Sequence, residues 1–99
     1  MSKVRIEDSE RTIGEATPQW INEQINRRRA DGIAVCVQVI FDQKPLEFAL
    51  STPTCARGGG GGRPLNQEEL KVLSLWEKLH LNTPEFTSGN LVAFLKQVT

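Results

Sequence analysis

The sequence predicts an α+β fold: one small domain over residues 1–99, with helices packed on one face of an antiparallel sheet of two or three strands. Two observations lead to this prediction. The only densely apolar and β-branched stretch, residues 32–51, divides around a polar, proline-containing segment at residues 42–45, as a β-hairpin does. Three other segments have the apolar spacing and end signals of helices. The predicted order is a weakly marked first strand, a helix, the hairpin and two helices.

The segment before the first helix carries the weakest pattern. Val4 and Ile6 alternate with charged residues over residues 3–7, which is the period of a half-buried strand. A disordered chain end is the alternative for so short a segment. Residues 8–16 are polar and contain one glycine, so we expect them to form a connector.

The first helix is expected at Pro18–Ala30. Thr17 is suited to cap its free amide groups, and Gly32 supplies a stop after its last turn. Its large apolar residues share one side: Trp20, Ile21 and Ile25. Three cations oppose the negative end of the helix dipole in the last turn: Arg27, Arg28 and Arg29.

The hairpin is expected to form the centre of the sheet. In its first strand, residues 33–41, both faces are mostly apolar, so we expect this strand to be central or covered on both sides. In the return strand, residues 46–50, apolar and polar residues alternate, so one face is expected to meet solvent. A turn over residues 42–45 would place Phe41 opposite Leu46.

The two cysteines are expected to be reduced thiols. Cys36 lies inside the first hairpin strand, where a cysteine behaves as a small hydrophobe. The expected turn places Cys36 near Ser51 and leaves Cys55 a few residues past it. A disulfide between them is the alternative, but two cysteines form no disulfide framework, and the cytoplasm keeps thiols reduced.

A loop of biased composition and two helices complete the chain. Residues 56–64 contain five consecutive glycines, which have high backbone entropy and no side chain to pack, so we expect a flexible loop. In the next helix, Asn66 and Glu69 have the spacing of a capping box, and Asn82 suits the left-handed position at its end. The last helix is expected to begin at residue 87 or 88.

Composition narrows the classes of function. Lys and Arg total 12, and Asp and Glu also total 12. This balance disfavours nucleic-acid binding, which usually shows a basic excess. The apolar run of the hairpin is too short to span a bilayer, and the charged N-terminal segment lacks the apolar core of a signal peptide. A cytoplasmic location is therefore expected.

Motifs for chemistry are weak in this sequence. A phosphate-binding loop needs a lysine and a hydroxyl residue after its last glycine, but Arg63 and Pro64 follow Gly62. His80 is the only histidine, and no Ser/His/Asp or Cys/His spacing can be recognised around it. A metal site would need His80 and both cysteines to converge with a fourth ligand. We therefore expect no catalytic residues, no cofactor and no metal.

By elimination, the sequence predicts a non-enzymatic interaction or regulatory module. It would dock a partner protein, or a second copy of itself, on a hydrophobic helix face or a strand edge. A narrow sheet has exposed edges, and pairing would cover them. The candidate partner-binding residues are Trp20, Arg28, Leu73, Trp76 and Phe94.

The alternative is a nucleic-acid-binding module that uses an arginine patch and the glycine-rich loop for sequence-blind phosphate contacts. Its candidate residues are Arg27, Arg28, Arg29, Arg57 and Arg63. This alternative predicts binding that falls steeply with salt. The interaction module instead predicts a protein partner that is retained after nuclease treatment.

Overall fold

The computed structural model describes residues 2–55, 64–83 and 85–98. Within these ranges the chain forms four strands and three helices. Their bounds are β1 Lys3–Ile6, β2 Ser9–Thr12, α1 Pro18–Ala30, β3 Val37–Ile40, β4 Ala49–Ser51, α2 Gln67–Lys78 and α3 Ser88–Val98. The glycine-rich loop predicted at residues 56–64 lies outside the described residues, apart from Pro64.

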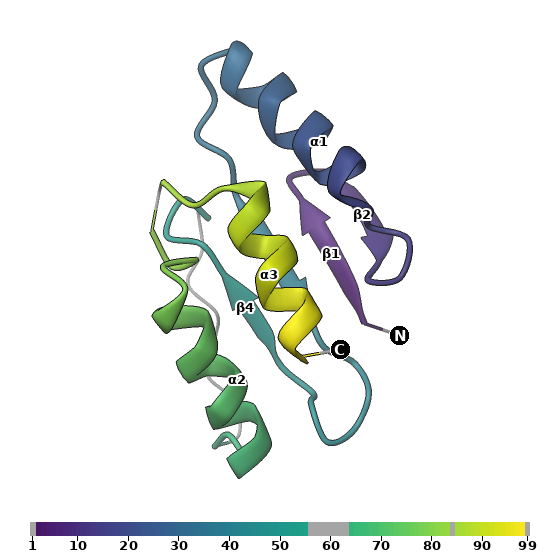
Figure 1. Cartoon of the computed structure of the whole chain (residues 1–99), viewed down its shortest axis with the longest axis vertical. Helices are drawn as coiled ribbons and strands as arrows, with labels where there is room; N and C mark the ends of the chain where they lie inside the picture. The colour runs from purple at the N-terminus through teal and green to yellow at the C-terminus, as the bar shows by residue number, and fades with distance from the viewer. Residues whose placement is uncertain (1, 56–63, 84, 99) are drawn as a thin grey trace.

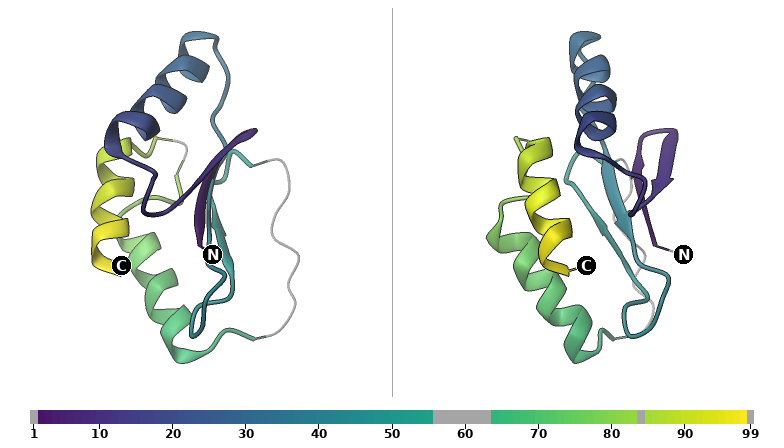
Figure 2. Two further views of the ribbon diagram at one scale, coloured as in Figure 1. Left: turned by 90° about the vertical axis from the view of Figure 1, so that its right-hand side faces the viewer. Right: turned by 45° about the vertical axis from the view of Figure 1, so that its right-hand side comes forward.

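The four strands form one antiparallel sheet in the order β2-β1-β3-β4 (Figure 1). The helices lie on one face of this sheet (Figure 2, left). The predicted α+β class is therefore confirmed, and β3 is a central strand, as the two apolar faces of its segment indicated. The number of strands is corrected from two or three to four.

The additional strand is β2, which lies in the segment predicted to be a connector. It pairs with β1 over four residue pairs. Its helix-facing positions are Ser9 and Arg11, because these residues lie opposite the buried Ile6 and Val4. Polar side chains at those two positions remove the alternation that marks a strand in the sequence.

The hairpin is confirmed, but its strands are shorter than predicted and their register differs by two residues. Phe41 donates its backbone N–H to the carbonyl of Phe48 (2.8 Å) and does not face Leu46. The chain reverses farther out, between Gln43 and Leu46, which also pair. A shift of two residues leaves every side chain on its expected face of the sheet.

Helix α1 has the predicted bounds and the predicted ends. Thr17 caps it by accepting a hydrogen bond from the backbone N–H of Trp20 (3.2 Å). Gly32 follows the helix with a φ of +75°, a conformation that glycine adopts without strain. The three apolar residues of the predicted inner side are buried: Trp20, Ile21 and Ile25.

Helix α2 begins with the predicted capping box. The Asn66 side chain accepts from the N–H of Glu69 (2.8 Å), and the Glu69 carboxylate accepts from the N–H of Asn66 (3.0 Å). Its end is corrected, because His80 and not Asn82 has the left-handed conformation, with a φ of +57°. The N–H of Leu81 then returns to the carbonyl of Trp76 (3.2 Å), as in a Schellman ending.

Helix α3 begins at Ser88, as predicted. Thr87 precedes it and accepts a hydrogen bond from the backbone N–H of Asn90 (3.3 Å). Phe86 and Leu91, which the sequence places on either side of this start, are both buried. Within the described ranges, no helix is long and apolar enough to cross a membrane.

The core fills the space between the sheet and the helices. Trp76 of α2 meets Phe94 of α3 edge to face, with ring centroids 5.2 Å apart. Near the hairpin tip, Phe41 stacks on Phe48 at 5.5 Å. The largest fully buried apolar residues are Trp76, Phe94, Ile6, Ile21, Leu81, Leu91, Val4, Val37 and Val39.

Candidate functional site

Two of the candidate partner-binding residues lie in the core. Trp76 is 1% exposed, and Phe94 is fully buried. Their rings contact each other and join α2 to α3. Phe94 therefore has no exposed surface that a partner could contact.

Trp20, a third candidate, is covered by the chain itself. It is 9% exposed, and the guanidinium carbon of Arg11 lies over its ring, 5.2 Å from the centroid. A cation in this position is attracted by the negative face of the indole. The contact attaches β2 to α1, which gives Trp20 a structural role.

Arg28, the fourth candidate, ties the β1–β2 turn to α1. It donates hydrogen bonds to Asp8 (2.7 Å), to Ser9 (3.2 Å) and to the backbone and side-chain oxygens of Gln24 (both 3.0 Å). The hydrogen bond and charge of Arg28 lower the pKa of Asp8 below its usual value. With its side chain 11% exposed, Arg28 has little surface left for a partner.

The arginines proposed for nucleic-acid contact are engaged separately. Arg27 pairs with Glu23 (3.2 Å), one turn earlier on α1. Arg29 donates to the carbonyl of Phe86 (2.9 Å), and Arg28 is bound as described above. The remaining two arginines of that prediction lie outside the described residues: Arg57 and Arg63. Arg27 and Arg28 do line one hollow, but they share it with the acidic residues Glu7, Asp8 and Asp31, so the surface there is not purely basic.

Cys36 and Cys55 form a disulfide, which corrects the expectation of two reduced thiols. The register explains the difference. Continued from β4, it brings Cys36 opposite residue 53, two positions nearer to Cys55 than predicted. Two hydrogen bonds also join Thr52 to Val37. The backbone N–H of Thr52 donates to the carbonyl of Val37 (3.0 Å), and the backbone N–H of Val37 donates to the side-chain hydroxyl of Thr52 (3.1 Å). The segment that follows β4 is thus held against β3.

The outer edge of β4 keeps hydrogen-bonding groups open. The N–H of Thr52 donates to the carbonyl of Val37 in β3. In an antiparallel pair this orientation alternates, so the residues two and four positions before Thr52 also turn their backbone groups toward β3. Leu50 is such a residue, whereas Ala49 and Ser51 turn their N–H and C=O groups away from the sheet. Among the described residues, no backbone or side-chain partner meets these outward groups. They can therefore pair with an added strand.

This open edge has a stop at each end. At one end, the outward N–H of Glu47 donates to the carboxylate of Glu69 (2.8 Å), which extends from the first turn of α2. Glu69 is fully buried and also completes the capping box. At the other end, the next outward position is Pro53, which has no N–H. The stretch that offers both outward N–H and outward C=O groups is thus limited to Ala49 and Ser51.

A hollow of about 430 Å³ lies beside the open edge. Residues of β4 and the segment after it line one side, and Leu73, Trp76 and Asn82 line the other. Figure 1 places α2 beyond β4, at the border of the sheet, and Figure 2 places it on the helix-covered side. Leu73, the fifth candidate residue, is half-buried and lies in this hollow. We call the open edge and this hollow the β4 groove.

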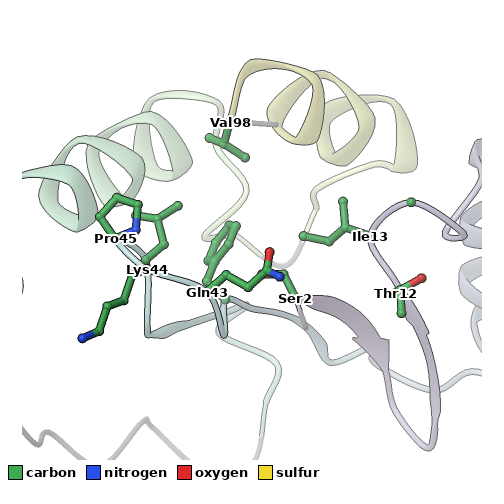
Figure 3. Close-up of a pocket in the computed structure, with 10 residues that line it drawn as sticks. Ser2, Thr12, Ile13, Gln43, Lys44, Pro45 and Val98 are labelled. Carbon is green, nitrogen blue, oxygen red and sulfur yellow. The ribbon is translucent and has the colours of Figure 1, made fainter.

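A second hollow, of about 470 Å³, lies at the hairpin tip (Figure 3). The β2–α1 connection, residues 43–46 and Val98 line it. Among the described residues that line it, only Lys44 has an ionisable side chain, which points away from the other labelled residues in Figure 3. General acid and base catalysis needs a positioned pair of titratable groups, which this lining does not supply.

Metal binding also finds no support in the part of the chain that the structure describes. No group of three or more His, Cys, Asp or Glu side chains there is arranged to hold a metal ion. His80 ends α2 with a left-handed backbone, and both cysteines are consumed by the disulfide. The three residues that a metal site would have needed thus have separate structural roles.

Sequence reasoning found part of the β4 groove and missed the rest. Leu73 and Trp76 were candidates, but Ala49, Ser51 and Asn82 were not. A usable signal was present: residues 48–53 carry no charge and end in proline. Exposed edges are usually protected by charged side chains, so an uncharged edge is a candidate for pairing.

Comparison with protein-family models, with curated proteins and with solved structures finds no match for this chain. Its function has to be argued from its own geometry.

Proposed function

We propose that this chain is a non-enzymatic protein-interaction module that binds an extended segment of a partner protein as a fifth strand beside β4. The observation that carries the proposal is the β4 groove, where open backbone groups of Ala49 and Ser51 lie next to a hollow lined by α2. Strand addition takes its affinity from main-chain hydrogen bonds and its specificity from side-chain pockets. Such binding needs no cofactor or metal.

The position of α2 supports this mode of binding. An added strand lies about 5 Å from the strand it joins. Beyond β4, that space is bordered on the helix-covered side by α2 (Figure 1). The added strand would therefore lie beneath a helix, as β1 and β3 do, and one of its faces would contact Leu73 and Trp76.

A different protein is favoured over a second copy as the partner. Two copies that joined β4 to β4 in antiparallel fashion would be related by a two-fold axis perpendicular to the sheet. The two α2 helices, one from each copy, would then lie on the same face of the joined sheet, one on each side of the β4–β4 junction. Because α2 already extends beyond β4, the two helices would compete for one space.

The proposal can be tested with a displayed library of random linear peptides. Peptides selected on the purified protein should shift the backbone amide resonances of Ala49 and Ser51 in a two-dimensional NMR spectrum. Ala49→Pro removes an outward N–H without breaking the ladder to β3, so it should weaken binding at least about tenfold. Glu10→Pro removes an outward N–H from the opposite edge of the sheet and should leave binding unchanged.

Two results would contradict the proposal: selection that enriches no peptide, or peptides that bind equally well to Ala49→Pro. The same protein preparation should be titrated with RNA and DNA at low and high salt. Binding to these that falls steeply with salt would favour the arginine alternative.

A cytoplasmic location belongs to the same proposal. The disulfide Cys36–Cys55 works against it, because disulfides persist mainly in oxidising compartments. Alkylation of free thiols in intact cells, before lysis, distinguishes a cytoplasmic location from an oxidising compartment. Two modified cysteines on a cytoplasmic protein would support the location, and a protected disulfide would indicate an oxidising compartment.

A further inference from the structure

We infer that the partner segment of the β4 groove is a short antiparallel strand with one large apolar residue at its centre and uncharged residues on either side of it. The inference rests on the proposed function and specifies the chemistry of the partner. It follows from three properties of the groove: the length of the open edge, the face to which Leu50 points beside Leu73 and Trp76, and the lack of charged side chains among the described residues that line the hollow.

The length of the segment follows from the two stops. Only Ala49 and Ser51 offer both an outward N–H and an outward C=O group, because the N–H of Glu47 is bound by Glu69 and Pro53 has no N–H. An antiparallel partner satisfies both residues with two of its own, separated by one residue. The recognised core is therefore three residues long, and its middle residue lies opposite Leu50.

The apolar residue follows from the face that Leu50 occupies. Residues directly opposite each other in a sheet point to the same face, with Cβ atoms about 5 Å apart. Leu50 is 4% exposed and points to the helix-covered face, where Leu73 and Trp76 line the hollow. The middle residue of the partner would enter this hollow, whose volume of about 430 Å³ accommodates a side chain such as that of leucine or phenylalanine.

The preference for uncharged flanking residues follows from the lining. The two outer residues of the partner would share the open face with Ala49 and Ser51. Every described residue that lines the hollow is uncharged: Gln38, Ala49, Leu50, Ser51, Thr52, Pro53, Cys55, Leu73, Trp76 and Asn82. A charged side chain at either flanking position would therefore gain no counter-charge from these residues.

A pair of capped synthetic peptides tests the inference. In both, threonines flank one central residue, which is leucine in the first peptide and serine in the second. Burial of a leucine side chain is worth enough to make the leucine peptide bind about tenfold or more tightly than the serine peptide. Both affinities can be measured by NMR titration, with the amides of Ala49 and Ser51 reporting where each peptide lies.

Two variants of α2 complete the test. Leu73→Trp fills the hollow and should bring the ratio of the two affinities close to one. Leu75→Trp changes another half-buried leucine of α2 that does not line this hollow, so the ratio should stay as in the unmodified protein. If Leu73→Trp does not fold, Leu73→Ser makes the hollow polar and should reduce the same ratio.

The outcomes separate the inference from the proposed function. Equal binding of both peptides, with shifts at Ala49 and Ser51, would overturn the apolar anchor and leave strand addition standing. A leucine preference that persists in Leu73→Trp would also overturn it, because the anchor would then lie elsewhere. If neither peptide binds, this specification of the partner is wrong, while the library selection decides on strand addition independently.

Discussion

The two edge strands of the sheet, β2 and β4, differ in how their outward backbone groups are protected. At β2, the outward residues are Glu10 and Thr12, and the carbonyl of Thr12 accepts hydrogen bonds from the chain that follows it, at Glu15 (3.0 Å) and Ala16 (2.9 Å). Glu10 also pairs with Lys3 (3.5 Å). The edge of β4 carries no charge and lies beside a hollow. This contrast supports the proposal that a partner strand would join the sheet at β4 and not at β2.

The two edge strands also differ in how they are attached to the rest of the domain. β2 is held by cationic side chains, with Arg11 over Trp20 and Arg28 bound to Ser9. β4 is bounded by a covalent link after its end and by the buried carboxylate of Glu69 before its start. Changes near β4 should therefore cost more stability than changes near β2.

The largest effect is expected from removing the disulfide. Cys36→Ala combined with Cys55→Ala opens a loop closed by a sequence separation of 19 residues, which should lower the free energy of unfolding by about 3 kcal/mol. Urea denaturation with and without a reductant measures this. The reductant should lower the stability of the unmodified protein and leave the double variant unchanged, and an unmodified protein insensitive to reductant would contradict the prediction.

The disulfide also shows what could be read from the sequence and what could not. Apolar periodicity and capping residues located α1 and the starts of α2 and α3, because those signals are local. The pairing of Cys36 with Cys55 depends on the register of the hairpin, which is set by where the chain reverses. An error of two residues there left all the faces correct and placed the cysteines too far apart.

Neither edge of the sheet was recognised from the sequence, and the reason differs between the two edges. β2 was missed because its helix-facing residues, Ser9 and Arg11, are covered by other side chains of the chain and not by apolar contacts. The β4 groove depends on backbone groups of Ala49 and Ser51, and the sequence indicates their outward hydrogen-bonding capacity only indirectly, through the lack of charge at residues 48–53. Leu73 was identified because a half-buried leucine on an amphipathic helix leaves a direct pattern in the sequence.

The next largest effect is expected at the start of β4. Glu69→Ala removes the acceptor of two backbone donors, the N–H groups of Asn66 and Glu47, and should lower the free energy of unfolding by about 2 kcal/mol. It should also free the N–H of Glu47, so peptides in the β4 groove should then shift that amide as well. Glu68→Ala, an exposed neighbour in the same turn, is the control and should change stability by less than about 0.5 kcal/mol.

An effect of similar size for Glu68→Ala and Glu69→Ala would mean that only the charge near the helix start matters. The stop at Glu47 would then not depend on Glu69.

At the other edge, the attachment of β2 should be weaker. Arg11→Ala removes the cation over Trp20 and should lower the free energy of unfolding by about 1 kcal/mol. Arg5→Ala removes an exposed arginine from the opposite face of β1 and should have almost no effect. Peptide affinity in the β4 groove should be the same in both variants, and a loss in Arg11→Ala would show that the two edges are coupled.

The smallest effect is expected from Asp8, which sits in the turn that begins β2. Arg28 lowers the pKa of Asp8 in the folded protein, so this carboxylate stabilises the fold when the pH is above its unfolded-state value of about 4. The stabilisation should disappear as the pH falls through the folded-state pKa. Asp8→Asn should therefore be less stable than the unmodified protein at neutral pH and equally stable in acid.

Because Asp8 is exposed, added salt should shrink that difference at neutral pH. Glu85→Gln, an exposed acid in the loop before α3, should show neither the pH dependence nor the salt dependence. A stability difference for Asp8→Asn that persists in acid would mean that Asp8 acts through the turn conformation and not through its charge. The edge at β2 would then be held by backbone geometry, and its contrast with the covalently bounded edge at β4 would be correspondingly smaller.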